Sequence, residues 1–560
     1  MSSRPIRLLD LETLHTDVLV VGGGYAGCFA AVKAVEAGAD VVMAVKGRAG
    51  RSGLTPWANS WFVFADTRGV SREDYVRQFV LSGEYLANMD FVDALIDESY
   101  QRYLEASAWG ARTGREHYYQ PGTVTRSIEV VDVGDAMRQK TVASGVRLLE
   151  RVMITSLIRH DQRVVGAVGF HLESGRPYAV LAGATVLCSG PASFKPLGMS
   201  YACSSATADG DAMAYRAGAE ISGKEFNDGH PARPANALAE APTFEVPDHA
   251  AFVLGGGPPS ASGPVAELDA ARLGMRTMSA MGVHDGGLPI DPKYIFTPGS
   301  KAGGRDGEPP GPFAAAPGYS TPGMSNHKAE GVFPKDTYGA SNVPGLWAAG
   351  DALSSMQNGA GYAGFGCSCA GSAVQGARAG RAAAEYAAGA AAPALPEGAL
   401  REVAREMLDP LTRTRGYSPA WVTRLLQDTM FPYYVMYVKE RRRMELALGQ
   451  IAYLQEKYAL ELKAGDPHGL RVAHETRNML LNAEMKLRAG LAREESRGTH
   501  YREDFPCRDD ERFLCWIALA QGDGGMVTVK HDIPAEWRPD PALAYREKYP
   551  VEFPGEASCL

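Results

Sequence analysis

The sequence predicts an α/β protein with a Rossmann-like main domain, an α+β domain inserted into it, and a helical region near the C-terminus. Two glycine-rich segments, far apart in the sequence, carry this prediction. Each follows an apolar run typical of a buried strand: Val18–Val21 precedes Gly22–Gly27, and Leu346–Ala349 precedes Gly350–Asp351. Residues 16–230 alternate strand-like and helix-like patterns, which indicates a doubly wound sheet.

The first segment has the Gly-x-Gly-x-x-Gly pattern of a dinucleotide-binding turn, with Tyr25 and Ala26 between Gly24 and Gly27. Glycines permit the tight turn, let backbone N–H groups approach a pyrophosphate, and let the next helix pack on the strand. A plain NAD site, or a turn without a ligand, would give the same motif. The second segment favours a flavin, because its strand ends in Asp351, an acid suited to bind ribityl hydroxyls.

Composition excludes several classes of protein. The chain has 560 residues, of which 45% are hydrophobic and 22% charged, an ordinary globular balance. The net charge of −8 argues against a nucleic-acid partner. No apolar run is long enough to span a bilayer, and the N-terminus lacks the apolar stretch of a secretory signal. None of the eight cysteines forms a C-x2-C pair, so we expect no metal site and reduced thiols, which indicates a cytoplasmic protein.

Further motifs occur in a fixed order along residues 16–510. They are Lys46-Gly47, Arg51-Ser52-Gly53, Ala184–Gly190, Asp209–Ala219 and Glu495–Pro506. With the two glycine-rich segments, this series resembles the succinate dehydrogenase/fumarate reductase flavoprotein superfamily. Residues 232–330 match that superfamily poorly. The Arg51-Ser52-Gly53 segment is also similar to the flavoprotein subunit of adenylylsulfate reductase.

The resemblance implies four regions. Residues 1–230 and 331–395 would form a discontinuous FAD-binding domain, and residues 231–330 a capping domain over the flavin. Residues 396–495 would be helical, and residues 496–560 a C-terminal extension. In the helical region Met444, Leu448, Ile451, Leu454 and Tyr458 recur at spacings of three and four, so they share one helix face, which we expect to pack in the core.

The resemblance also implies the residues that bind FAD. They are Gly22, Gly24, Tyr25, Ala26, Gly27, Lys46, Arg51, Ser52, Gly53, Gly190, Asp211, Gly350, Asp351, Cys367 and Ser368. Val45 stands where the family usually has a glutamate that binds the adenosine ribose, so another group must hold the ribose. Gly53 stands where succinate dehydrogenases have the histidine that bonds to the flavin, so we expect non-covalent FAD.

Three residues are candidates for catalysis. His230 matches a substrate-contacting histidine of the family, although a structural role in its Gly/Pro loop is the alternative. His327 lies close to the family's second pocket histidine, one residue out of register. Tyr362 stands where the family has its carboxylate-binding arginine. A phenol offers one neutral donor and an aromatic face, whereas a guanidinium offers a charged planar fork, so we do not expect succinate or fumarate as substrate.

We therefore expect an FAD-dependent oxidoreductase that reduces an activated C=C bond of a small molecule or dehydrogenates a CH–CH unit. Three alternatives stay open: sulfur chemistry like that of adenylylsulfate reductase, an O2-using oxidase, and a flavoprotein subunit that only conducts electrons. The electron partner would be a separate ferredoxin-like iron–sulfur subunit. Arg441–Arg443 are either a solvated face or its docking patch, and oligomerisation stays open.

Overall fold

A computed structural model describes most of the chain. The described residues are 11–56, 60–62, 64, 71–118, 126–195, 205–227, 283–284, 288–289, 328–361, 366–390, 395–430, 433–436, 438–549, 553 and 555–559. The predicted capping domain lies outside them, except for the short strands β11 (Val283–His284) and β12 (Leu288–Pro289), which pair with each other, and residues 328–330.

The main sheet has seven strands and confirms the α/β prediction. Its order is β6-β2-β1-β9-β8-β7, and β14 also pairs with β9. The bounds are β1 (Glu12–Val21), β2 (Val41–Val45), β6 (Arg147–Glu150), β7 (Val152–His160), β8 (Arg163–His171), β9 (Pro177–Leu187) and β14 (Leu346–Ala348). β6, β2, β1, β9 and β14 are parallel, whereas β7 and β8 form an antiparallel extension.

Strand β9 joins the two glycine-rich segments. One edge pairs with β1 in register Val21 to Leu187, and the C-terminal part of the other edge pairs with β14 in register Ala348 to Leu187. All three strands are buried and apolar at this end, as expected of a parallel sheet covered on both faces. The two segments therefore leave the same edge of the sheet, where ligands of doubly wound folds bind.

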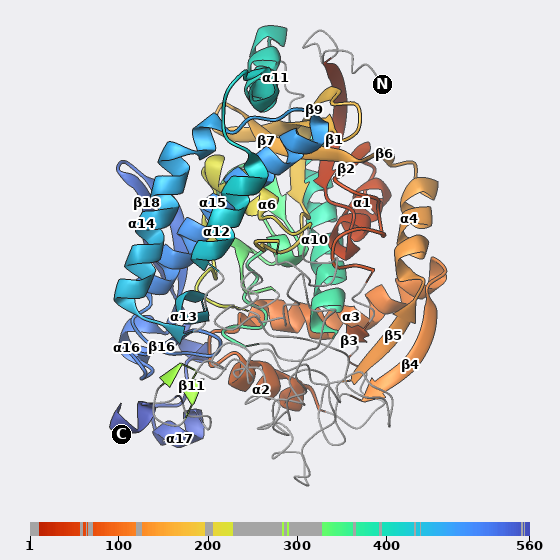
Figure 1. Cartoon of the computed structure of the whole chain (residues 1–560). Helices are drawn as coiled ribbons and strands as arrows, with labels where there is room; N and C mark the ends of the chain where they lie inside the picture. The colour runs from red at the N-terminus through yellow and green to blue at the C-terminus, as the bar shows by residue number, and fades with distance from the viewer. Residues whose placement is uncertain are drawn as a thin grey trace, which may run out of the picture.

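Two helices cover one face of this sheet. They are α1 (Tyr25–Glu36) and α10 (Cys367–Gly389), and they stand side by side near the centre of Figure 1. On their other side lie α2 (Arg72–Ser82), α3 (Met89–Ala108) and α4 (Val133–Ala143), with a small sheet of β3 (Ser60–Phe62), β5 (Arg126–Val131) and β4 (Arg112–Tyr118).

The predicted helical region contains the helices α11 (Glu397–Thr412), α12 (Pro419–Met430), α13 (Tyr433–Met436), α14 (Arg441–Lys457) and α15 (Pro467–Ala492). It is drawn in teal to blue in Figure 1, with α11 at the top, where it packs on β7, β8 and β9, and α14 at the left. Met444, Ile451 and Leu454 of α14 are buried in one core cluster, with Leu448 and Tyr458 packed against it. The expected core face of this helix is therefore confirmed.

The C-terminal extension is built into the rest of the molecule. Its strands β17 (Cys515–Gly522) and β18 (Gly525–Asp532) join β10 (Ile221–Ser222) and β13 (Gly331–Val332) in a four-stranded sheet. β16 (Tyr501–Arg502) pairs with β15 (Val438–Lys439), and the short helices are α6 (Asp209–Arg216), α16 (Asp510–Phe513) and α17 (Tyr545–Lys548). The two segments on either side of the predicted cap, β10 and β13, thus pair with each other, and the other edge of β10 pairs with β17.

Candidate functional site

The turn between β1 and α1 has the backbone that its glycines predict. Gly22 has a φ of 111°, and a β-carbon there would overlap the carbonyl group of Cys188. A β-carbon at Gly27 would overlap the carbonyl oxygen of Gly22, so helix and strand meet backbone to backbone. Gly24 is the N-cap of α1 and supplies no side-chain cap. The first N–H groups of α1 can therefore receive a phosphate, and their partial positive charge favours it.

Helix α10 brings a second helix N-terminus to the site. At Gly376 and Gly380, α10 lies so close to α1 that β-carbons there would overlap the carbonyl oxygens of Ala26 and Ala30. α10 begins at Cys367, more than two turns before Gly376, so its N-terminus extends roughly 13 Å past Ala26 at 1.5 Å per residue. Two parallel helix N-termini at that spacing fit a dinucleotide that lies across both.

The side chain of Tyr25, from the first turn of α1, reaches the first turn of α10. Cys367 and Cys369 are buried thiols that form no disulfide, and Cys369 contacts the hydroxyl of Tyr25. Burial, together with Cys369, raises the pKa of Tyr25 well above its ordinary value. Ser368, between the two cysteines, lies in the first turn of α10, where its backbone N–H belongs to the helix N-terminus.

The segment after β2 places two predicted cofactor residues in ion pairs. The Nζ atom of Lys46 donates to Asp209 at 2.7 Å and to Glu475 of α15 at 3.0 Å. Arg51 is half-exposed and pairs with Asp135, its Nε atom donating at 2.7 Å. Their charges are therefore engaged by protein carboxylates, and the predicted contacts of Lys46 and Arg51 with FAD stay predictions.

Gly53 and Gly190 leave room beside the glycine turn. They have φ angles of 70° and 79°, and no atom of the described residues lies within 4 Å of a β-carbon built at either position. Ser52 lies in the same segment as Gly53 and donates its hydroxyl to the carbonyl oxygen of Arg48 at 2.8 Å. Open space flanked by backbone in these conformations fits the predicted path of a cofactor.

Asp351 and Asp211 have different surroundings. Asp351 follows β14 in a single 3-10 turn (Gly350–Ala352), and its carboxylate pairs with Lys328 at 2.8 Å. Asp211 lies in α6, where its carboxylate pairs with the buried Lys224. Burial raises the pKa of Asp211 to about 6, although Lys224 opposes this. Its predicted contact with FAD is untested.

The three candidate catalytic residues, His230, His327 and Tyr362, lie outside the described residues. The segments that lead to them are anchored by C-terminal residues. Asn227 donates its side-chain amide to the carbonyl oxygen of Met436 at 2.8 Å. Ala360 accepts a hydrogen bond from the backbone N–H of Thr499 at 2.8 Å.

A buried ionic network that sequence reasoning did not find lies close to these anchors in sequence. Arg493 pairs with Glu225 at 3.0 Å and with Glu495 at 2.8 Å, and Glu495 also pairs with Arg497. All four side chains are fully buried or nearly so. The charged residues of the Glu495–Pro506 motif are the signal that could have predicted it, because buried charges need partners.

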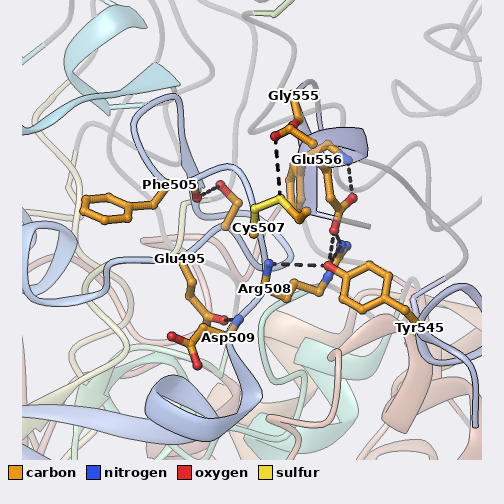
Figure 2. The surroundings of a disulfide bond; sticks show 12 residues. Glu495, Phe505, Cys507, Arg508, Asp509, Tyr545, Gly555 and Glu556 are labelled. Carbon is orange, nitrogen blue, oxygen red and sulfur yellow. Dashed lines mark hydrogen bonds and ion pairs between the residues drawn. A yellow bond between two sulfur atoms is a disulfide. The ribbon is translucent and has the colours of Figure 1, made fainter.

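A disulfide corrects the expectation that the thiols are reduced. Cys507 and Cys559 are bonded, with their Cα atoms 6.0 Å apart (Figure 2). The bond holds the C-terminal tail against Arg508, which pairs with the buried Glu556 of the tail and with Glu84 at 2.9 Å. Cysteine spacing alone could not indicate this pairing.

Among the described residues no helix is long and apolar enough to cross a membrane. Within the same part of the chain, no cluster of three or more His, Cys, Asp or Glu side chains could hold a metal ion.

Comparisons with known proteins agree with this geometry. Residues 17–235 match the model of an FAD binding domain, and residues 423–543 match the fumarate reductase flavoprotein C-terminal model. A fumarate reductase (CoM/CoB) subunit of Methanothermobacter marburgensis is 28% identical over 89% of this chain and 96% of its own length.

Two solved structures share the fold. Mycobacterium smegmatis Sdh1 in complex with UQ1 has a TM-score of 0.75 and 23% identity, over 96% of this chain and 98% of that one. Adenylylsulfate reductase of Archaeoglobus fulgidus has a TM-score of 0.70 and 20% identity, over 95% and 97% of the two chains.

Proposed function

Because the chain is an FAD-dependent oxidoreductase of the fumarate reductase/succinate dehydrogenase flavoprotein family, we propose that it reduces an activated C=C bond, or runs the reverse CH–CH dehydrogenation, on a substrate other than succinate or fumarate. The relatives named as fumarate reductases support C=C chemistry. The observation that carries the choice of substrate is Tyr362, which stands where the family binds a carboxylate with arginine.

The chain's own residues would bind and orient the cofactor. The N–H groups at the start of α1, beyond Gly24, would hold the pyrophosphate, and Asp351 would accept hydrogen bonds from the ribityl hydroxyls. The N-terminus of α10, at Cys367 and Ser368, would stabilise negative charge at the flavin end. Bound there, FAD supplies the two-electron redox chemistry.

The candidate pocket residues would act on the substrate. His230 would orient or polarise it, and Tyr362 would donate a hydrogen bond or lie against a ring. A neutral phenol cannot replace the bidentate contact that guanidinium makes with a carboxylate, so bulkier, less anionic substrates are favoured.

A reductase assay tests the choice of substrate. The FAD-loaded chain is mixed with reduced viologen and a candidate substrate, which is fumarate or a cyclic or aromatic enone or enoate. The rate of viologen oxidation is then measured. We expect negligible fumarate turnover by the parent, and measurable fumarate turnover after Tyr362→Arg, which restores the family's arginine. Robust fumarate reduction by the parent would contradict the proposal.

The same preparation separates the alternatives. Bleaching of the flavin by dilute sulfite would favour sulfur chemistry, and rapid reoxidation by O2 with release of peroxide would favour an oxidase. A chain that binds FAD but no organic ligand would be an electron conduit.

His230→Ala should keep FAD and lower turnover by about 10²–10⁴-fold if His230 contacts the substrate.

We also propose a separate iron–sulfur protein as electron partner. A related protein is named as one subunit of a larger enzyme, and among the described residues no group of three or more His, Cys, Asp or Glu side chains could hold a metal ion. Arg441 and Arg443 contribute little net charge to a docking face, because they pair with Glu494 and Glu503. Co-purification from the native host therefore tests the partner better than substitution of these arginines. Full turnover of the isolated chain with O2 or NAD(P)H alone would contradict it.

A further inference from the structure

Lys328 is a buried cation next to the second glycine-rich segment. Its side chain is fully buried, and its Nζ atom lies 2.8 Å from a carboxylate oxygen of Asp351. The same Nζ atom donates to the hydroxyl of Ser372, in α10, at 2.7 Å. Burying an ammonium group is unfavourable unless it is paired and hydrogen-bonded, so this geometry is specifically built.

The position of Lys328 relative to the glycine turn gives this cation a possible role. A β-carbon at Gly350 would lie 2.8 Å from the β-carbon of Ala26, in α1, and 3.7 Å from the Nζ atom of Lys328. The ammonium group is therefore close to the beginning of α1, to α10 and to Asp351. These are the three parts of the molecule to which we assign the cofactor.

The backbone holds Lys328 in an unusual conformation. Its φ is 74°, a left-handed value that is rare for a residue other than glycine. The hydroxyl of Ser355 donates to its carbonyl oxygen at 3.1 Å, and the hydroxyl of Ser354 donates to the next carbonyl oxygen, that of Ala329, at 2.8 Å. Strained backbone fixed by neighbouring hydrogen bonds occurs often at functional sites.

We propose that Lys328 is a positioning residue for FAD: it fixes the ionised carboxylate of Asp351 for the ribityl chain and adds a positive charge to the flavin site. The proposal rests on FAD as cofactor and on Asp351 as its ligand, and it does not depend on the substrate. Burial lowers the pKa of Lys328, and the negative charge of Asp351 opposes this; among the described residues, the buried thiols of Cys188 and Cys369 also lie near its ammonium group.

Two measurements test this role without turnover. FAD is titrated into the apoprotein and followed by quenching of flavin fluorescence, and the midpoint potential of the bound flavin is measured with redox dyes. Lys328→Gln keeps a donor for Ser372 and Asp351 but removes the charge. We expect FAD binding to weaken by roughly ten-fold, because the charge-assisted hydrogen bond of Lys328 is about twice as strong as the neutral one that glutamine would make. The potential should fall, because reduction adds negative charge to the flavin.

A double variant shows whether Lys328 acts through Asp351. Asp351→Asn alone should weaken FAD binding, and Lys328→Gln/Asp351→Asn should weaken it by little more. This double variant carries no unpaired buried charge, so it should fold even if a single variant does not. Lys335→Met is the matched control, because Lys335 is an exposed lysine of the same segment.

Parent-like affinity and potential in Lys328→Gln would overturn the proposal. So would losses that add in the double variant, because two independent contacts would then be at work. Neither result would bear on the substrate, which the viologen assay tests.

Discussion

Gly376 of α10 lies so close to Ala26 of α1 that a β-carbon on Gly376 would overlap the carbonyl oxygen of Ala26. Gly380 makes the same contact with Ala30 one turn later. This approach fixes where the N-terminal end of α10 lies relative to the glycine turn. If the cofactor lies across both helix N-termini, its binding should depend on this packing.

Gly376→Ala should therefore destabilise the protein and reduce its FAD content. The added methyl group forces α10 away from α1, and overpacking of this kind costs about 1–3 kcal/mol. Unfolding in urea and the ratio of flavin to protein absorbance measure the two effects.

Gly398→Ala is the matched control. Gly398 lies in α11 with no atom within 4 Å of its β-carbon position, so alanine there should stabilise the helix by up to about 1 kcal/mol. Glycine to alanine should thus lower the free energy of unfolding at position 376 and raise it at position 398. Equal effects would contradict the close approach of α1 and α10.

FAD should be released when the protein is denatured in acid. Gly53 offers no nucleophile where related dehydrogenases bond to the flavin, and the space around its β-carbon position is open. After acid precipitation we expect the yellow colour in the supernatant. Flavin fluorescence that stays on the polypeptide in a denaturing gel would contradict this expectation.

Gly24→Val should abolish retention of FAD. A β-carbon at Gly24 would lie 2.9 Å from the hydroxyl oxygen of Thr55, and the branched side chain would cover the N–H groups of α1. Gly449→Val, in α14, is the control, because its β-carbon position is open and far from the turn in sequence. This control should keep its flavin.

Local patterns predicted the parts of the site that depend on backbone. The strand, glycine turn and helix at Val18–Gly27 are one continuous segment, and their geometry follows from residues close in sequence. The core face of α14 is likewise a local periodicity. Such features can be predicted from sequence because they depend on the backbone preferences of single residues or on the spacing of apolar residues along one helix.

Long-range pairings were not predictable from the sequence. The tail was interpreted as an extension, yet β17 pairs with β10, about 300 residues earlier. Lys328 was overlooked because lysine is usually exposed, and only its partners Asp351 and Ser372 explain why it is buried. Lys46 was predicted to bind FAD, and nothing local indicates its ion pairs with Asp209 and Glu475.

Glu475 should make stability depend on pH in the acidic range. Burial raises the pKa of this carboxylate, but Lys46, Lys195 and Arg471 outweigh burial and lower it to about 2. A depressed pKa contributes stability above the unfolded value of 4.5, and that contribution is lost as the pH falls from 4.5 to about 2.

Glu475→Gln should therefore lower stability at pH 7 by an amount on the order of 3 kcal/mol, since the partly buried Lys46 and Lys195 both lose an anionic partner. The difference in free energy of unfolding between this variant and the parent should shrink as the pH falls from 4.5 to about 2. Urea unfolding at a series of pH values measures this. Glu456→Gln, an exposed change in α14, should have little effect, and a pH-independent loss in Glu475→Gln would contradict the ion-pair argument.

Reduction of the disulfide should release the C-terminal tail. The Cys507–Cys559 bond closes a segment with a sequence separation of 52, and loss of such a bond typically costs about 2–4 kcal/mol. Glu556 would still hold the tail through Arg508 and Tyr545 (Figure 2), so we expect loosening and not global unfolding.

Cys507→Ser should be trimmed faster by carboxypeptidase than the parent, and a reductant should speed trimming of the parent but not of the variant. Cys515→Ser, which changes a free buried thiol, should be trimmed at the parent rate. If the untreated parent reacted with thiol reagents at Cys507 and Cys559, the bond would not form in solution, and the ion pairs of Glu556 alone would hold the tail.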